Sequence, residues 1–259
     1  MEQPPSPGTK LVNIEESMES LLRFTLRAHL DEPVPSLDLE RDFCLHLLEE
    51  EDTDSTEKPP MYKLLARALS ECLTTVDKNS SFEKYSKLFH GSGHDLVNML
   101  KKVSFELHVQ EPYFTQLKDG LKSTEGRCAV GDYMRSDSLT SFILVTFVCP
   151  LRISSGAFIL FNKCLLLQVQ DVRQYTSFSE MLRVEGLAKV LPGVESIEEG
   201  VGVYRNFYPQ EKERMNGVVA IRVAKPIDQP YAAMAGVLSE LKSTGIKGLL
   251  DDYAARVTL

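Results

Sequence analysis

The sequence predicts an α+β protein in which a helical N-terminal subdomain precedes a β-containing domain. Two changes of pattern support this class. Apolar residues recur at helical spacing through the first hundred residues, and the spacing changes to strict alternation at Phe105, Leu107 and Val109. A final stretch at 230–243 returns to helical spacing and predicts a closing helix.

The N-terminal subdomain is expected to consist of amphipathic helices. Asn13, with Glu16 three residues later, is typical of a helix N-cap. The acidic stretch 49–54 predicts a solvated loop. Apolar stripes predict helices at 14–30, 43–48, 61–72 and 96–103.

The second domain is expected to mix strands and helices. Residues 157–161 and 165–172 flank a short polar turn and predict a β-hairpin. Capping pairs predict two helix starts, at Ser177 with Glu180 and at Ser196 with Glu199, and alternation predicts a last strand at 218–223. We therefore expect three parts: a helical subdomain at 1–103, a β-containing domain at 104–224 and a helical tail at 225–259.

Composition limits the possible functions. The chain has 259 residues, of which 43% are hydrophobic and 25% charged, so disorder of the whole chain is not expected. The net charge of −8 argues against nucleic-acid binding by bulk electrostatics. Most of that charge lies in residues 1–103 (net −7), whereas residues 104–224 carry a net charge of −1 and can present a basic face.

No feature of the sequence predicts a membrane protein or a secreted one. The longest apolar run, Phe142 to Val148, is too short to span a bilayer, and Met1 to Pro5 lack the pattern of a signal peptide. We expect an intracellular protein, cytoplasmic or nuclear, without a membrane partner. The sequence gives no sign that distinguishes nucleus from cytoplasm.

We expect neither metal nor cofactor. Five cysteines without a C-x-x-C pair predict free thiols. His90 and His94 have the spacing of a helical metal pair, but the glycines between them disfavour a helix. The nucleophile elbow, the P-loop, the H-E-x-x-H motif and the Rossmann fingerprint are all missing from the sequence, which removes several large enzyme classes.

One cluster of residues is a candidate site. Gln110-Glu111-Pro112-Tyr113 precedes a short helix, and Gly120-Leu121-Lys122-Ser123-Thr124-Glu125-Gly126-Arg127 follows, with Gly131-Asp132 after it. Lys122 and Glu125 converge only if Lys122 still belongs to the turn at Gly120, because residues three apart face opposite sides of a strand. The alternative is that these are ordinary surface charges of a strand.

This cluster resembles the signature of the ASCH domain, in which glutamine, proline and an aromatic residue precede G-x-K-x-x-E-x-R and a later G-D. The resemblance extends over roughly 104–224 and is closest to plant ASCH-domain proteins with a helical N-terminal extension. It implies a PUA-like (ASCH) β-barrel with flanking helices and a cleft for RNA or a nucleotide-like ligand. By position, Lys122, Glu125 and Arg127 would line that cleft, and Tyr113 would stack on a base.

The resemblance implies an RNA- or nucleotide-binding module acting in RNA metabolism or transcription co-regulation. Lys122 and Arg127 are expected to be a ligand-binding cationic pair that folding does not require. Glu125 would accept from a base amine or hold Lys122.

Two alternatives stay open. Small bacterial ASCH-type proteins hydrolyse N4-acetylcytidine with a lysine, a threonine and a glutamate, so an amidohydrolase would use Lys122, Thr124, Glu125 and Glu185. Hydrolysis is disfavoured because Glu125 stands where those proteins have the threonine. The second alternative is a protein-interaction adaptor that works through the acidic helical subdomain.

The apolar stretch at about 135–153 departs from the family pattern. It contains the continuous run Phe142 to Cys149 and has no expected place in the barrel. We expect it to pack loosely or to project with apolar exposure.

Overall fold

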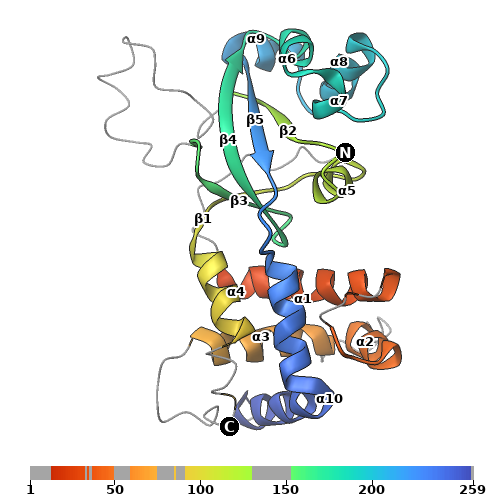
Figure 1. Ribbon diagram of the computed structural model, residues 1–259, viewed down its shortest axis with the longest axis vertical. Helices are drawn as coiled ribbons and strands as arrows, with labels where there is room; N and C mark the ends of the chain where they lie inside the picture. The colour runs from red at the N-terminus through yellow and green to blue at the C-terminus, as the bar shows by residue number, and fades with distance from the viewer. Residues whose placement is uncertain are drawn as a thin grey trace, which may run out of the picture. The chain divides into compact units, whose positions relative to one another are not determined.

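The computed structural model describes residues 13–32, 34, 37–49, 59–74, 85, 91–129 and 153–257. These residues divide into two compact units. A sheet unit lies within 103–162 and 166–226, and a helical unit lies within 12–102, 163–165 and 227–259. Helices dominate the N-terminal region and a sheet follows, so the predicted α+β class is confirmed (Figure 1).

The helical unit is built from amphipathic helices. Leu21, Leu22 and Leu26 of the first helix are fully buried, as its apolar stripe predicts. That helix packs against α3 and α10, and α10 also packs against α4. The described helices of this unit are α1 (Ile14–Asp31), α2 (Arg41–Leu48), α3 (Met61–Thr74), α4 (Ser92–Lys101) and α10 (Pro230–Val257).

The predicted helix cap at Asn13 is confirmed. Its side-chain oxygen accepts from the backbone N–H groups of Glu15 and Glu16, and its amide donates to the Glu16 carboxylate. This arrangement satisfies N–H groups that have no partner within the first turn.

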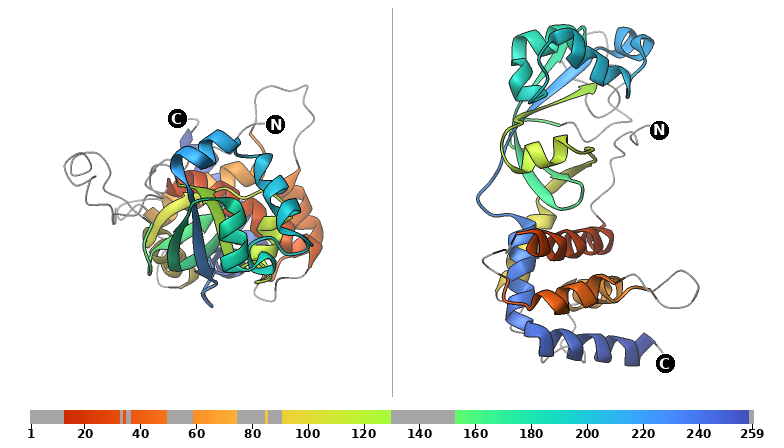
Figure 2. Two further views of the ribbon diagram at one scale, coloured as in Figure 1. Left: turned by 90° about the horizontal axis from the view of Figure 1, so that it is seen from above. Right: turned by 90° about the vertical axis from the view of Figure 1, so that its right-hand side faces the viewer.

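Helix α10 is longer than the closing helix that the sequence predicts. It continues past residue 243 to Val257 and bends sharply at Lys242, whose φ is 57° (Figure 2). Apolar side chains from both parts of α10, including Met234, Leu238, Ile246 and Leu249, are fully buried. Residues 227–257 therefore complete the helical unit.

The sheet unit contains a five-stranded sheet among its described residues. Its strands are β1 (Val103–Leu107), β2 (Thr124–Cys128), β3 (Phe158–Phe161), β4 (Leu165–Tyr175) and β5 (Val218–Ala224). The spatial order is β1-β3-β4-β5-β2. Strand β1 runs parallel to β3, and β5 runs antiparallel to both β4 and β2. Strand β2 therefore lies at one end of the described sheet.

The predicted hairpin is confirmed as β3 and β4. Two of its three turn residues, Asn162 and Lys163, have φ values of 49° and 59°. Positive φ at both central positions is typical of a type I′ turn, whose twist matches that of the flanking strands. The hairpin places β4 in the middle of the sheet.

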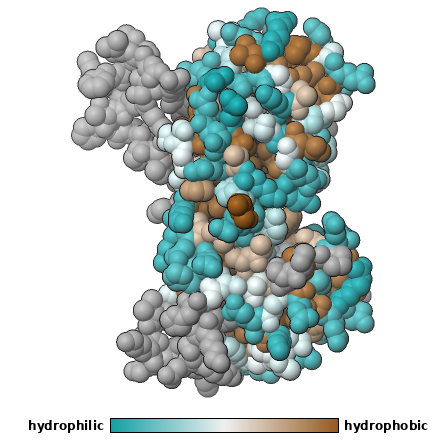
Figure 3. Space-filling view, in the orientation of Figure 1, coloured by the Kyte–Doolittle hydropathy of each residue, from teal (hydrophilic) through white to brown (hydrophobic). Residues whose placement is uncertain are grey.

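Short helices cover part of the sheet. They are α5 (Tyr113–Lys118), α6 (Phe178–Glu185), α7 (Leu187–Val190), α8 (Ile197–Arg205) and α9 (Gln210–Asn216). Ser177 caps α6 by accepting from the Glu180 N–H, and Ser196 caps α8 by accepting from the Glu199 N–H, as predicted. Buried residues of α6 and α8 form one core with Val218 and Ala220 of β5. Apolar side chains remain visible on the surface over α7 and α8 (Figure 3).

Several sequence predictions lie outside the described residues. These are the acidic loop beyond Glu49, His90, Gly131-Asp132, Cys149 and the apolar stretch 135–153 except for its last residue, Ile153. Within the described part, Cys44, Cys72, Cys128 and Cys164 are free and buried. The same part shows no cluster of three possible metal ligands. None of the described helices has both the length and the apolar character to cross a bilayer.

Candidate nucleotide-binding site

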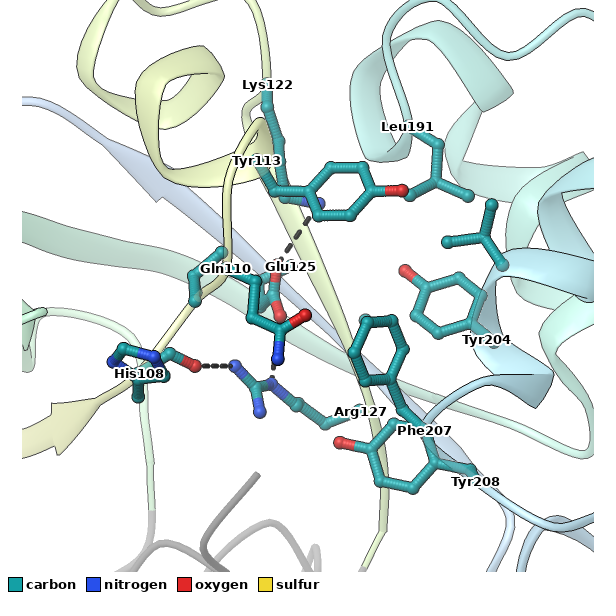
Figure 4. Close-up of a pocket in the computed structure, with 13 residues that line it drawn as sticks. His108, Gln110, Tyr113, Lys122, Glu125, Arg127, Leu191, Tyr204, Phe207 and Tyr208 are labelled. Atoms are coloured by element: carbon teal, nitrogen blue, oxygen red, sulfur yellow. Dashed lines mark hydrogen bonds and ion pairs between the residues drawn. The ribbon is translucent and has the colours of Figure 1, made fainter. Parts of the chain in front are cut away.

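A pocket in the sheet unit brings together three stretches of the chain (Figure 4). The first stretch, 108–113, follows β1 and enters α5. The second, 122–127, is the turn into β2 with most of β2. The third, 191–208, runs from just after α7 to the residues that follow α8. The hollow measures about 460 Å³, a figure that includes the part open to solvent. The residues that line it are His108, Val109, Gln110, Tyr113, Lys122, Glu125, Gly126, Arg127, Leu191, Val203, Tyr204, Phe207 and Tyr208.

Lys122, Glu125 and Arg127 form a buried ion-pair network in one wall of the pocket. Lys122 Nζ lies 3.1 Å from Glu125 Oε2, and Arg127 Nε lies 2.9 Å from Glu125 Oε1. The three residues are 3%, 7% and 7% exposed. Two cations share one anion, so the network leaves a net charge of +1 beside the pocket.

Lys122 also bonds to two main-chain carbonyls. Its ammonium donates to the oxygen of Thr124 at 2.8 Å and to the oxygen of Val190. With the Glu125 carboxylate, these acceptors occupy all three N–H bonds of the ammonium. Gly120, with φ of 77°, makes the turn that lets Lys122 converge on Glu125. Lys122 therefore ties β2 to the end of α7.

Arg127 is fixed in a similar way. One of its terminal nitrogens donates to the main-chain oxygen of His108 at 2.6 Å, which joins β2 to the segment after β1. The two cations thus bridge three segments of the chain through one carboxylate, and their burial gives them a structural role as well as a place in the pocket.

Burial and charge act in opposite directions on Glu125. Burial alone would raise the pKa of this carboxyl, but the charges of Lys122 and Arg127 together outweigh burial and lower it. Burial lowers the pKa of Lys122, and Glu125 partly opposes that shift. Glu125 is therefore held as a carboxylate.

An aromatic wall, formed by Tyr204, Phe207 and Tyr208, stands opposite the network (Figure 4). Tyr204 and Tyr208 stack on Phe178 of α6, with ring centroids 4.1 Å and 5.6 Å from its own. Phe178 is fully buried, and its N–H donates to Glu213 Oε1 at 2.7 Å. Glu213 is also paired with Arg205, next to Tyr204 in sequence. The aromatic wall is thereby anchored to α6 and α9.

The tyrosines in the pocket are neutral hydrogen-bonding groups. Burial raises the pKa of Tyr113, Tyr204 and Tyr208, and the charge of Glu125 raises the pKa of each further. Their hydroxyls therefore stay protonated near neutral pH and can donate as well as accept. Tyr113 also lies near the Lys122 ammonium, 5.7 Å from ring centroid to Nζ.

Residues 150–227 match the family model of the ASCH domain. The chain contains an ASCH domain. The match covers β3 to β5 with α6 to α9, including the aromatic wall. Lys122, Glu125 and Arg127 precede the matched residues and complete, from β2, the pocket that Leu191 and residues 203–208 line within the match. We call it the ASCH pocket.

Two solved structures are similar to part of the chain. The crystal structure of the hypothetical protein PH0355 is 40% identical over 47% of this chain and 97% of its own, with a TM-score of 0.37. The solution structure of protein PF0455 from Pyrococcus furiosus is 39% identical over 48% of this chain and 97% of its own, with a TM-score of 0.35. No curated protein matches the chain.

The structure gathers some of the predicted site residues in the ASCH pocket and not others. Tyr113, Lys122, Glu125 and Arg127 all line it. Thr124 is fully buried outside the lining, and its hydroxyl has no hydrogen-bond partner among the described residues. Glu185 accepts from the Tyr175 hydroxyl at 2.5 Å and also lies outside the lining.

Sequence reasoning missed the aromatic wall as a site. Tyr204, Phe207 and Tyr208 lie three and four residues apart, which places them together at the end of one helix. This spacing predicts a cluster of three aromatic rings. It does not identify a pocket by itself, because aromatic residues at helical spacing also form ordinary cores.

Proposed function

We propose that the sheet unit binds single-stranded RNA or a nucleotide-like ligand in the ASCH pocket, between the ion-pair network and the aromatic wall. The observation that carries this proposal is the combination of four aromatic side chains with a buried network of net charge +1 in one pocket. Aromatic faces suit the flat surface of a base, and positive charge suits the phosphates attached to it.

Stacking supplies much of the affinity in this proposal. A base stacked on an aromatic side chain contributes about 1–3 kcal/mol, independently of base identity. The chain as a whole is acidic, so bulk attraction for RNA is small. Binding therefore depends on the pocket, and modest sequence preference is expected.

Fluorescence anisotropy of a labelled uridine octamer, U8, tests the proposal. Phe207 lines the pocket and is only partly buried, so Phe207→Ala should weaken binding about ten-fold while the protein stays folded. Tyr253→Ala in α10 is the matched control, because Tyr253 is a partly buried aromatic of the helical unit. Equal affinities of the wild type and Phe207→Ala would contradict the proposal.

A role in RNA metabolism or transcription co-regulation, and the closeness to plant ASCH-domain proteins, remain predictions. So do residence in the cytoplasm or nucleus and a protein partner for the acidic helical part. The boundaries 1–103, 104–224 and 225–259 also stay proposals.

An amidohydrolase is the second candidate, and the lowered pKa of Lys122 is the observation that favours it. Against it, Thr124 and Glu185 lie outside the pocket lining, and internal acceptors occupy the Lys122 ammonium. We expect no release of acetate from N4-acetylcytidine by the purified protein. Turnover that disappears in both Lys122→Ala and Thr124→Ala, while circular dichroism shows both variants folded, would establish the hydrolase instead.

A further inference from the structure

The middle residue of β2, Gly126, directs its main-chain groups away from β5, toward the outer edge of the described sheet. Strand β2 pairs with β5 in antiparallel register, with Glu125 opposite Ile221 and Gly126 opposite Ala220. In such a pair, successive residues direct their N–H and C=O groups alternately toward the partner strand and away from it. Whether Gly126 bonds to β5 or directs its N–H and C=O groups outward depends on the phase of this alternation, that is, on which residues of β2, odd-numbered or even-numbered, pair with β5.

Hydrogen bonds at the two ends of the strand fix that phase. Val223 N donates to Ser123 O at 2.9 Å, and Ala129 N donates to Gly217 O at 3.0 Å. Odd-numbered residues of this segment therefore bond to β5, and even-numbered residues face outward. Thr124 agrees with this phase, since its outward carbonyl accepts from Lys122.

Gly126 thus presents one donor and one acceptor to the pocket that it lines. Among the described residues, β5 is the one strand paired with β2, and no main-chain partner of Gly126 is seen on the outward side. Buried main-chain groups rarely lack a partner, so this pair is suited to receiving a ligand. The groups beside it are the Glu125 carboxylate and the Tyr204 ring.

We propose that the main-chain N–H and C=O of Gly126 bind the Watson–Crick edge of one unpaired nucleobase, whose flat faces contact the aromatic wall. This inference rests on the proposed function and specifies its ligand. Every base carries a donor and an acceptor side by side on that edge, and these match the acceptor and donor of one residue in an extended strand. A base in a duplex has this edge occupied and is excluded.

An added peptide strand is the other partner that an open sheet edge can bind. The surroundings of Gly126 favour a base, because strand addition needs several outward positions in a row. The outward carbonyl of Thr124 is already occupied by Lys122. Thr124 and Cys128, the other outward residues of β2, do not line the pocket, so Gly126 offers a place there for one flat group.

Chemically modified RNA tests whether the Watson–Crick edge of the base is needed for binding. U8, U8 built from N3-methyluridine and U8 built from 5-methyluridine are titrated by fluorescence anisotropy. The N3-methyl group blocks the Watson–Crick edge and should weaken binding about ten-fold, whereas the 5-methyl group lies on another edge and should change affinity less than about two-fold. A U8–A8 duplex should bind as weakly as the blocked oligomer.

Nuclear magnetic resonance locates the contact on the protein. Carbonyl-labelled glutamate with ¹⁵N-labelled glycine selects the three Glu-Gly pairs of the sequence, whose amides belong to Gly126, Gly186 and Gly200. Saturating U8 should move the Gly126 amide resonance and leave the other two near their positions. These two amides are internal controls within the same unit.

The outcomes distinguish the two levels of the proposal. Absence of U8 binding overturns the proposed function and this inference together. Binding of U8 with equal affinity for the N3-methyl oligomer, or with an unmoved Gly126 amide, overturns the inference alone. Displacement of U8 by an extended (Val-Thr)₄ peptide assigns the edge to strand addition and also overturns it.

Discussion

The ring of Phe178 stacks on the ring of Tyr204 with a centroid separation of 4.1 Å and an interplanar angle of 9°. Phe178 is fully buried on α6, whereas Tyr204 faces the ASCH pocket from α8. This stack holds the aromatic wall in place, because Tyr204 and Tyr208 cannot shift without losing contact with the buried ring of Phe178.

Replacement of Phe178 by leucine should loosen that wall. We expect Phe178→Leu to lower the free energy of unfolding by about 1–3 kcal/mol, since two ring contacts and part of the buried volume are lost. U8 affinity should fall as well. Urea denaturation and anisotropy measure the two effects, and Val184→Ala, an exposed change on the same helix, should alter neither.

Replacement of Lys122 by methionine should destabilise the protein strongly. The change leaves the Thr124 and Val190 carbonyls without their donor and removes one cation from Glu125. Breaking a buried ion pair in this way costs about 3–5 kcal/mol. The sequence-based expectation that folding does not require Lys122 predicts no change. Lys189→Met, at an exposed lysine of α7, is the control in thermal unfolding.

Much of the fold could be predicted from patterns of residues close together in the sequence. The caps at Asn13, Ser177 and Ser196 and the β3–β4 hairpin depend on residues close in sequence, so propensity and spacing suffice. The pairing of β2 with β5 was not predictable, because it joins residues nearly a hundred positions apart and alternation does not identify a partner strand. The burial of Lys122, Glu125 and Arg127 follows from that pairing and was missed with it.

Acid should weaken the folded state through Glu125. Its pKa is lowered on folding, so the carboxylate contributes stability that is fully present above its unfolded pKa, near 4.5, and is lost as pH falls through the folded value. In Glu125→Gln this contribution is missing at every pH. The difference in unfolding free energy between the wild type and Glu125→Gln should therefore shrink below about pH 4.5. A difference that is constant from pH 7 to pH 3 in urea titrations contradicts this assignment.

Gly126→Ala should lower both stability and U8 affinity, although an extended strand can accommodate a side chain at this position. Its Cβ would lie 2.4 Å from the Tyr204 hydroxyl and 2.7 Å from Met181 Cε. Gly126→Ala should therefore destabilise the protein by about 1–3 kcal/mol and weaken U8 binding by displacing Tyr204. Gly202→Ala in α8 meets open space and should instead stabilise by about 0.5–1 kcal/mol. Calorimetry of both variants compares the two signs.

Photocrosslinking tests most directly whether the ASCH pocket is where RNA binds. U8 containing 4-thiouridine is crosslinked to the purified protein, and the modified peptides are identified by mass spectrometry. The account predicts crosslinks to Tyr113 and to the segment 203–208, which lines the pocket with it, and their loss when unlabelled U8 competes. Crosslinks confined to residues 13–101 or 230–257 would contradict it and assign RNA binding to the helical unit.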